Sequence, residues 1–172
     1  RDLPDLERVK QTIVRSDSRQ AMLAARDPRV RVEMIRQEGG TTLTEAAVSR
    51  GLRWLHLHQS NDGSWSLDRF HHTRSCDGRC HGHATLRSDA AATALVLLPF
   101  LGAGQTHLVG RYQDAVSLGL RWLIEHQEPD GDLRADSEGN SGMYAHGQAA
   151  IVLCEAYAMT GDAQLQEPAQ RA

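Results

Sequence analysis

The sequence predicts an all-α protein built from two helical hairpins, whose outer and inner helices form part of a ring. Residues 47–63 recur as residues 115–131, with twelve identities in seventeen positions and no gap. A fixed period of this kind marks a repeat architecture. In each copy an amphipathic helix precedes a nearly all-apolar one, and this order favours an exposed outer layer around a buried inner layer.

The first helix of the first copy has apolar residues at helical spacing along one face. These residues are Ala47, Val48, Gly51, Leu52, Trp54 and Leu55. Arg50, Arg53 and His56 take the other side. We expect Thr44 to cap the start of this helix, because threonine is a favoured N-cap. Residues 60–63 read SNDG, and this turn chemistry predicts its end.

The second helices are predicted over residues 89–101 and 144–159, with Gly104 and Gly161 closing them. These glycines are 57 positions apart, whereas the first helices are 68 apart. The first copy therefore holds about eleven extra residues between its helices. A solenoid with shorter repeats fits poorly, because a long loop interrupts each hairpin.

The domain division follows from this pattern. Residues 1–40 are predicted to be an amino-terminal helical segment, with Leu6, Val9 and Ile13 and then Val30, Met34 and Ile35 at helical spacing. Residues 41–172 form the repeat domain, with repeat one at about 44–104 and repeat two at about 112–161. The tail resembles the start of the second copy, so we expect the natural protein to continue.

Composition limits the range of functions. A net charge of −3 gives no sign of nucleic-acid binding, and no apolar run has the length of a membrane span. The chain begins at Arg1 without an initiator methionine, so we expect it to be cut from something longer, and its localisation stays undetermined. A partial ring would leave one apolar edge, either exposed or covered by a second copy of the chain.

One motif occurs in both copies. In the first copy Arg50, Gly51, Trp54, Gln59, Gly63 and Trp65 follow the spacing RGxxWLxxxQxxxGxW, and the second keeps Gly119, Trp122, Gln127 and Gly131. This spacing resembles the QW motif of squalene–hopene and oxidosqualene cyclases. The chain is thus similar to the terpenoid cyclase and protein prenyltransferase superfamily. The resemblance implies a partial α/α toroid, in which these residues tie an outer helix to the following turn.

The catalytic residues of that superfamily are not visible in this segment. Aligning Thr93 and Ala94 with the cyclase motif DxDDTA leaves Asp89 as its one aspartate, because Ala90, Ala91 and Ala92 follow. The Asp-x-Cys zinc pair of the prenyltransferases does not occur either. These absences favour a non-enzymatic segment. Asp89 and His146 are the candidates for an acid–base pair at the mouth of a cavity.

The loop of the first copy reads HHTRSCDGRCHGH over residues 71–83. Cys76, Cys80, His81 and His83 are the residue types that zinc prefers, and they lie within eight positions. Three interpretations stay open for the loop: a structural zinc site, a Cys76–Cys80 disulfide, and free thiols. The remaining cysteine, Cys154, lies in an apolar helical stretch and is expected to be a core residue.

Three functions stay open. The first is a non-catalytic repeat module whose apolar concave surface takes an isoprenoid-like or peptide ligand, or a protein partner. The second is a fragment of an isoprenoid cyclase or prenyltransferase with its active residues in repeats outside this segment. The third is a purely structural module whose loop is held by a metal or a disulfide.

Overall fold

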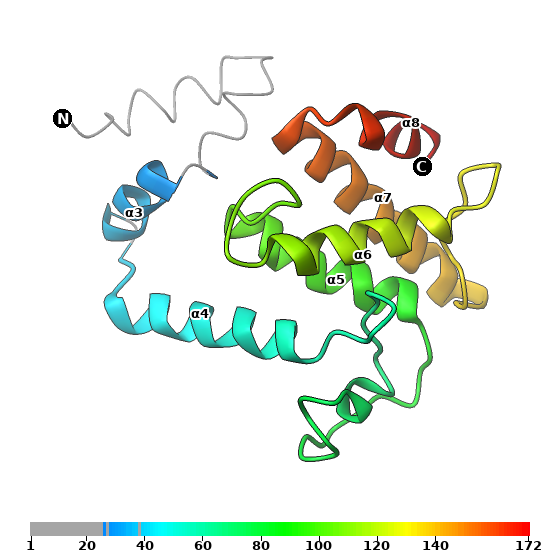
Figure 1. Ribbon diagram of the computed structural model, residues 1–172, viewed down its shortest axis with the longest axis horizontal. Coiled ribbons are helices and arrows are strands. Elements are labelled where there is room, and N and C mark those ends of the chain that lie inside the picture. The colour runs from blue at the N-terminus through cyan, green and yellow to red at the C-terminus, as the bar shows by residue number, and fades with distance from the viewer. Residues whose placement is uncertain (1–25, 27, 38) are drawn as a thin grey trace.

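A computed structural model describes residue 26 and residues 28–37 and 39–172 (Figure 1). The described part of the chain is all-α and contains no β-strand. Its helices are α3 (Pro28–Gln37), α4 (Thr42–Leu57), α5 (Asp89–Gly102), α6 (Gln113–Glu125), α7 (Gly139–Thr160) and α8 (Ala163–Arg171), with a short 3₁₀ helix η2 (Phe70–His72). None of these helices is long and apolar enough to cross a bilayer.

The predicted hairpins are confirmed as α4–α5 and α6–α7. The inner helices α5 and α7 pack closely on each other, α6 covers α5, and α8 packs on α7 (Figure 1). The inner helices supply most of the core, including Leu97, Phe100 and Leu153, which are fully buried. The arrangement is that of a partial α/α toroid with an outer and an inner layer. The expected domain boundary at residue 40 stays a prediction.

The amino-terminal expectation is met in part. Helix α3 covers the predicted stretch around Val30, whose side chain is buried. Leu6, Val9 and Ile13 lie outside the described residues.

Helix α4 begins earlier than predicted. Thr41, not Thr44, is its N-cap, and the two threonines form a reciprocal capping box. The Thr44 amide donates to the Thr41 hydroxyl at 3.3 Å, and the Thr41 amide donates to the Thr44 hydroxyl at 2.9 Å. Thr44 therefore occupies the third helical position, where it satisfies the amide of the cap residue.

Helix α5 matches the prediction and α7 does not. Ser88 caps α5, and its hydroxyl accepts a hydrogen bond from the Ala91 amide. Helix α7 starts at Gly139, five residues before the predicted Tyr144. Its first turn is rich in glycine, a poor helix former, and Gly142 lies against Arg134 and Ser137 of the preceding loop, where a Cβ would come within 2.7 Å of Arg134 Cδ. The close fit to this loop accounts for a glycine at that position.

The two copies are buried to different extents. Val116 and Trp122 of α6 are 0% and 6% exposed, whereas their counterparts Val48 and Trp54 of α4 are 42% and 43% exposed. On α4 only Leu52 is buried. Helix α6 lies against Trp65 and Leu97, which come within 3.0 Å of the position a Cβ would take on Gly119. Two similar sequences therefore give one enclosed outer helix and one open outer helix.

The prediction for Cys154 was wrong. Cys154 lies on an exposed part of α7, where its sulfur contacts the carbonyl of Ala169 at 3.7 Å. The apolar stretch around it belongs to an inner helix with one side buried against α5 and another side open. Apolar composition alone does not tell these sides apart.

Candidate functional site

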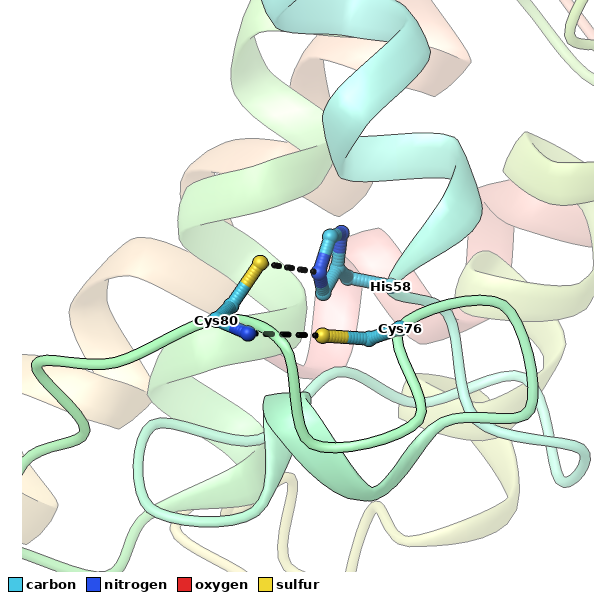
Figure 2. Close-up of side chains that lie close together, drawn as sticks. All are labelled: His58, Cys76 and Cys80. Atoms are coloured by element: carbon cyan, nitrogen blue, oxygen red, sulfur yellow. Dashed lines mark hydrogen bonds between the residues drawn. The ribbon is translucent and has the colours of Figure 1, made fainter.

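Three side chains meet beside the carboxyl end of α4 (Figure 2). The ligand atoms of His58, Cys76 and Cys80 all lie within 4.8 Å of one another. His58 and Cys76 are buried, and Cys80 is partly exposed. The loop between α4 and α5 folds back so that both sulfurs approach the imidazole. This group is the densest set of soft ligands in the described part of the chain.

His58 is held by helix α4. Its Nδ1 lies 2.6 Å from the Trp54 carbonyl oxygen, and its ring stacks on the Trp54 indole at 3.9 Å between centroids. Since a carbonyl can only accept, Nδ1 carries the hydrogen and Nε2 is left with its lone pair. This Nε2 lies 3.3 Å from the Cys80 sulfur (Figure 2). A backbone-anchored Nδ1 is the usual arrangement behind a metal-binding Nε2.

A tight turn brings the two cysteines together. Asp77 and Gly78 both have positive φ, 51° and 71°, which reverses the chain between them. The Cys80 amide then donates to the Cys76 sulfur at 3.3 Å. Both sulfurs thus face the same small volume beside the imidazole.

The two thiols differ in acidity. Burial opposes ionisation of Cys76, but hydrogen bonds from the Cys80 side chain and amide and from the Arg79 amide outweigh it, so its pKa lies below the ordinary value. The pKa of Cys80 is raised, chiefly because its hydrogen bond to the Cys76 sulfur would be lost on ionisation. The pair therefore holds its first negative charge on Cys76.

The sequence prediction named part of this group and missed His58. Cys76 and Cys80 lie together as expected, but His81 and His83 are not in the group. His83 instead stacks on His71, with ring centroids 4.7 Å apart, and His81 is exposed. All three cysteines are free, so the structure holds no Cys76–Cys80 disulfide. In the sequence His58 lies eighteen residues before Cys76 and recurs as His126, so its spacing gives no sign of a shared site with the cysteines.

The second copy repeats the histidine geometry without cysteines. His126 Nδ1 lies 2.8 Å from the Trp122 carbonyl oxygen, and the two rings stack at 3.9 Å. The histidine–tryptophan pair is thus a feature of the repeat. The first copy differs through its longer loop, residues 58–88 against 126–138, which brings in Cys76 and Cys80.

Asp89 and His146 have separate partners. Asp89 forms an ion pair with Arg69, which raises the pKa of the Arg69 guanidinium, and its Oδ1 is buried without a hydrogen-bond partner. His146 Nδ1 accepts a hydrogen bond from the Leu133 amide at 3.2 Å and lies 4.0 Å from Asp132. No contact joins Asp89 to His146 among the interactions of the described residues.

The surroundings of Asp89 are polar. Asp136, from the second copy, accepts hydrogen bonds from the Asp89 and Ala90 amides, the shortest at 2.9 Å. Two cavities of about 420 and 630 Å³ share Asp62, Arg69 and Asp89 in their walls. The neighbouring positions Ala90 and Ala92 are buried in the core, at 0% and 3% exposure.

The residues of the repeated motif form ties between successive units. The Gln59 amide donates to the carbonyls of Gly63 and Ala115, each at 2.9 Å. The Gln127 amide donates to the carbonyls of Gly131 at 3.3 Å and Pro168 at 3.0 Å. Each glutamine thus joins the turn after its own helix to the next helix but one along the chain, α6 for Gln59 and α8 for Gln127. Helix α8 accepts the glutamine hydrogen bond of the second copy, just as α6 accepts that of the first.

Other residues of the motif have local roles. The Trp65 indole N–H donates to the Leu55 carbonyl at 2.7 Å, and the ring is buried. Its amide donates to the Thr93 hydroxyl at 3.0 Å, which ties the turn to α5. Arg50 bonds the Ala46 carbonyl on the exposed side of α4, and no side chain or neighbouring backbone approaches Gly51 within 4 Å.

Comparison with known proteins gives one family and one relative. The model of the squalene–hopene cyclase C-terminal domain matches residues 31–146. The squalene–hopene cyclase of Zymomonas mobilis is 26% identical over 99 residues, which cover 56% of this chain. The same match covers 13% of the length of that enzyme. No solved structure matches significantly.

Proposed function

The chain belongs to the squalene–hopene cyclase C-terminal domain family, and from this premise we propose that it is a non-catalytic repeat module with an apolar ligand surface. The surface is the open side of the inner helices α5 and α7. Its ligand is an isoprenoid-like hydrocarbon chain. The module supplies the scaffold and the apolar wall, and no acid for carbocation chemistry.

The observation that carries this proposal is which residues stand at the aspartate positions of the cyclase motif DxDDTA. Protonation of an alkene needs a strong, protonated carboxylic acid beside the hydrocarbon. Ala91 and Ala92 stand at the second and third aspartate positions of the motif, and Ala92 is packed in the core, so neither position offers such a group. The Asp89 carboxyl is engaged by the Arg69 guanidinium in polar surroundings, not placed beside a hydrocarbon. These contacts support a module without the acid chemistry of a cyclase.

The apolar surface is suggested by exposed side chains on the inner helices. Leu95 of α5 and Ile151 of α7 are 45% and 56% exposed, although both helices are otherwise deeply buried. Leu97 faces α6, and Leu95 lies two residues away on the opposite side of the helix. Exposed apolar groups on paired helices favour an apolar ligand, because covering them removes hydrocarbon surface from water.

A fluorescent polyene analogue of squalene tests this surface. The double variant L95Q/I151Q is expected to weaken binding of the probe at least tenfold, since two apolar contacts are lost. L108Q is the matched control, because Leu108 is 51% exposed in the loop between α5 and α6. Equal binding by wild type, L95Q/I151Q and L108Q would contradict the proposed surface.

A second candidate is a segment of an isoprenoid cyclase or prenyltransferase whose active residues lie outside residues 1–172. The observation favouring it is that the match covers only 13% of the bacterial squalene–hopene cyclase. The natural full-length polypeptide should then carry an intact acidic motif or zinc pair, and should convert an isoprenoid substrate. A full-length protein with neither property would leave the non-catalytic module as the better account.

We further propose that α4 is an association edge. Its apolar residues Leu43, Val48 and Trp54 are exposed, whereas α6 buries the counterparts of the last two. A second copy of the chain would cover this edge. Sedimentation at increasing concentration should show a dimer that V48E weakens, and a monomer at all concentrations would contradict this.

A further inference from the structure

We propose that His58, Cys76 and Cys80 bind one zinc ion, which pins the long loop of the first copy to the end of α4. The ligand atoms are His58 Nε2 and the two sulfurs. The inference does not depend on the apolar surface, because the site lies at the carboxyl end of an outer helix and the surface lies on the inner helices.

The spacing of the three atoms fits tetrahedral zinc. With Zn–S of about 2.3 Å and Zn–N of about 2.0 Å, ligand atoms in a tetrahedron lie about 3.5–3.8 Å apart. Here the Cys80 sulfur and His58 Nε2 are 3.3 Å apart, and all three atoms are within 4.8 Å. An ion can enter with shifts of a few tenths of an ångström to about one ångström, and no backbone rearrangement is needed.

The imidazole is prepared for a metal. The hydrogen bond from Nδ1 to the Trp54 carbonyl fixes the tautomer that leaves Nε2 free, and stacking on Trp54 fixes the ring plane. Such outer contacts hold a ligand in place before the ion arrives. With the histidine fixed on α4, the loop is the partner that must be brought to it.

The sulfurs supply the charge that zinc needs. Two thiolates and one neutral imidazole balance the +2 charge of the ion, so a largely buried complex would be neutral. The Arg79 guanidinium interacts favourably with both sulfurs when they carry negative charge. Binding of Zn²⁺ by the two thiols and the neutral imidazole would release both thiol protons to solvent.

The length of the loop between α4 and α5 suggests what a metal ion would stabilise. Residues 58–88 contain no regular element apart from η2, which is unusual for a connection of this length. The second copy makes the same connection with residues 126–138 and has the His126–Trp122 pair but no cysteine. The three metal ligands therefore occur in the first copy, where an ion would hold the long loop against α4. The second copy, with its short loop, has the histidine but not the cysteines.

The fourth coordination position would take a water molecule. Cys80 is partly exposed, so one side of the group is open to solvent. His81 is exposed and His83 is stacked on His71, so neither completes the set. This ligand set differs from the one that the spacing in the sequence suggested.

The test uses the reduced chain, freed of metal and titrated with Co²⁺, which reports its ligands by absorption. We expect one Co²⁺ per chain, a thiolate-to-cobalt charge-transfer band, and displacement by Zn²⁺. C76S, C80S and H58Q should each lose the band, while H81A and H83A keep it. H126Q is the matched control, because it removes the equivalent histidine where no cysteine is near. No band in the wild-type chain, or a band lost in H81A or H83A but kept in H58Q, would overturn the proposal.

Two further measurements separate ligand loss from misfolding. The variant H58C replaces nitrogen with a third sulfur, so it should bind Co²⁺ with a stronger charge-transfer band; an unchanged band would contradict a His58 ligand. In the wild-type chain Zn²⁺ should protect Cys76 and Cys80 from alkylation by at least tenfold, while the exposed Cys154 reacts equally with and without the ion. If Zn²⁺ left the alkylation rates of Cys76 and Cys80 unchanged, as it should leave that of Cys154, the result would also contradict the site.

Discussion

The Gln59 side chain donates a hydrogen bond to the Ala115 carbonyl at 2.9 Å, and so joins the turn of the first copy to the outer helix of the second. The same amide nitrogen reaches the Gly63 carbonyl at 2.9 Å. Gln127 makes the corresponding bonds to Gly131 and Pro168. The two copies are therefore connected by side-chain bonds as well as by apolar packing.

Replacing Gln59 should weaken this connection. Q59L leaves the Ala115 carbonyl without its side-chain partner, and we expect a loss of about 1–3 kcal/mol in the free energy of unfolding. Urea denaturation followed by circular dichroism measures the loss. Q170L is the control, since Gln170 is exposed on α8. Equal stability of the two variants would show that the Gln59 bond contributes nothing.

Gly63 should not tolerate a side chain. Its φ is +95°, and a Cβ there would lie 2.7 Å from the Leu118 carbonyl oxygen. G63A is expected to cost more than the roughly 1–2 kcal/mol of a left-handed residue alone, because α6 must also move away. Gly39 has φ +85° with nothing within 4 Å of a Cβ. Thermal unfolding should therefore show a larger loss for G63A than for G39A, and equal losses would contradict the close approach.

The alanines at the acid positions should resist restoration of the acid. Ala92 is buried, so A92D is expected to cost several kcal/mol by placing a carboxylate in the core. Ala91 is only partly buried, and A91D should cost less. Urea denaturation of both variants compares them. A stable A92D chain would indicate that the position opens onto a cavity, as in a working cyclase.

The start of α8 should depend on pH. The Gln164 amide and then His107 donate to the Asp162 carboxylate, and these bonds hold its pKa below the usual 3.8. Its stabilising contribution is therefore present above about pH 4 and is lost as the pH falls through the lowered pKa. D162A should cost about 1 kcal/mol at pH 7 as a lost helix cap.

Denaturation of D162A and wild type at several pH values checks this dependence. The difference between them should shrink below pH 4. E125Q is the control, because its ion pair with Arg121 is mostly exposed, and it should show no measurable loss at any pH. A constant D162A effect from pH 7 to pH 3 would rule out the ionised Asp162 as its cause.

The sequence was informative where the repeat sets the structure. Both hairpins and the turn at Gly63 follow from periodicity and local chemistry, which act over a few residues. The different burial of Val48 and Val116 was not predictable, since it depends on which helices lie beside the two similar outer helices. Likewise the start of α7 at Gly139 was not predictable, since glycine is a poor helix former and the close fit of Gly142 to Arg134 and Ser137 appears only in the fold.

The candidate metal group was also predictable only in part, because one of its residues is distant in the sequence. The spacing of Cys76 and Cys80 pointed to a compact site, because residues four apart can meet through a tight turn. His58 lies eighteen residues before Cys76, and only the folded loop brings it near. Its recurrence as His126 suggested scaffold, and that geometry is indeed shared. A histidine can thus belong to the repeat and still lie beside two cysteines in one copy.

The most direct test of the proposed function is photolabelling with a diazirine analogue of squalene, followed by peptide mapping and analysis of the unbound lipid. We predict labelling on α5 and α7 near Leu95 and Ile151, and recovery of the remaining squalene analogue unchanged. Labelling confined to α4, or the appearance of a cyclised product, would contradict a non-catalytic module that binds its ligand on the inner helices.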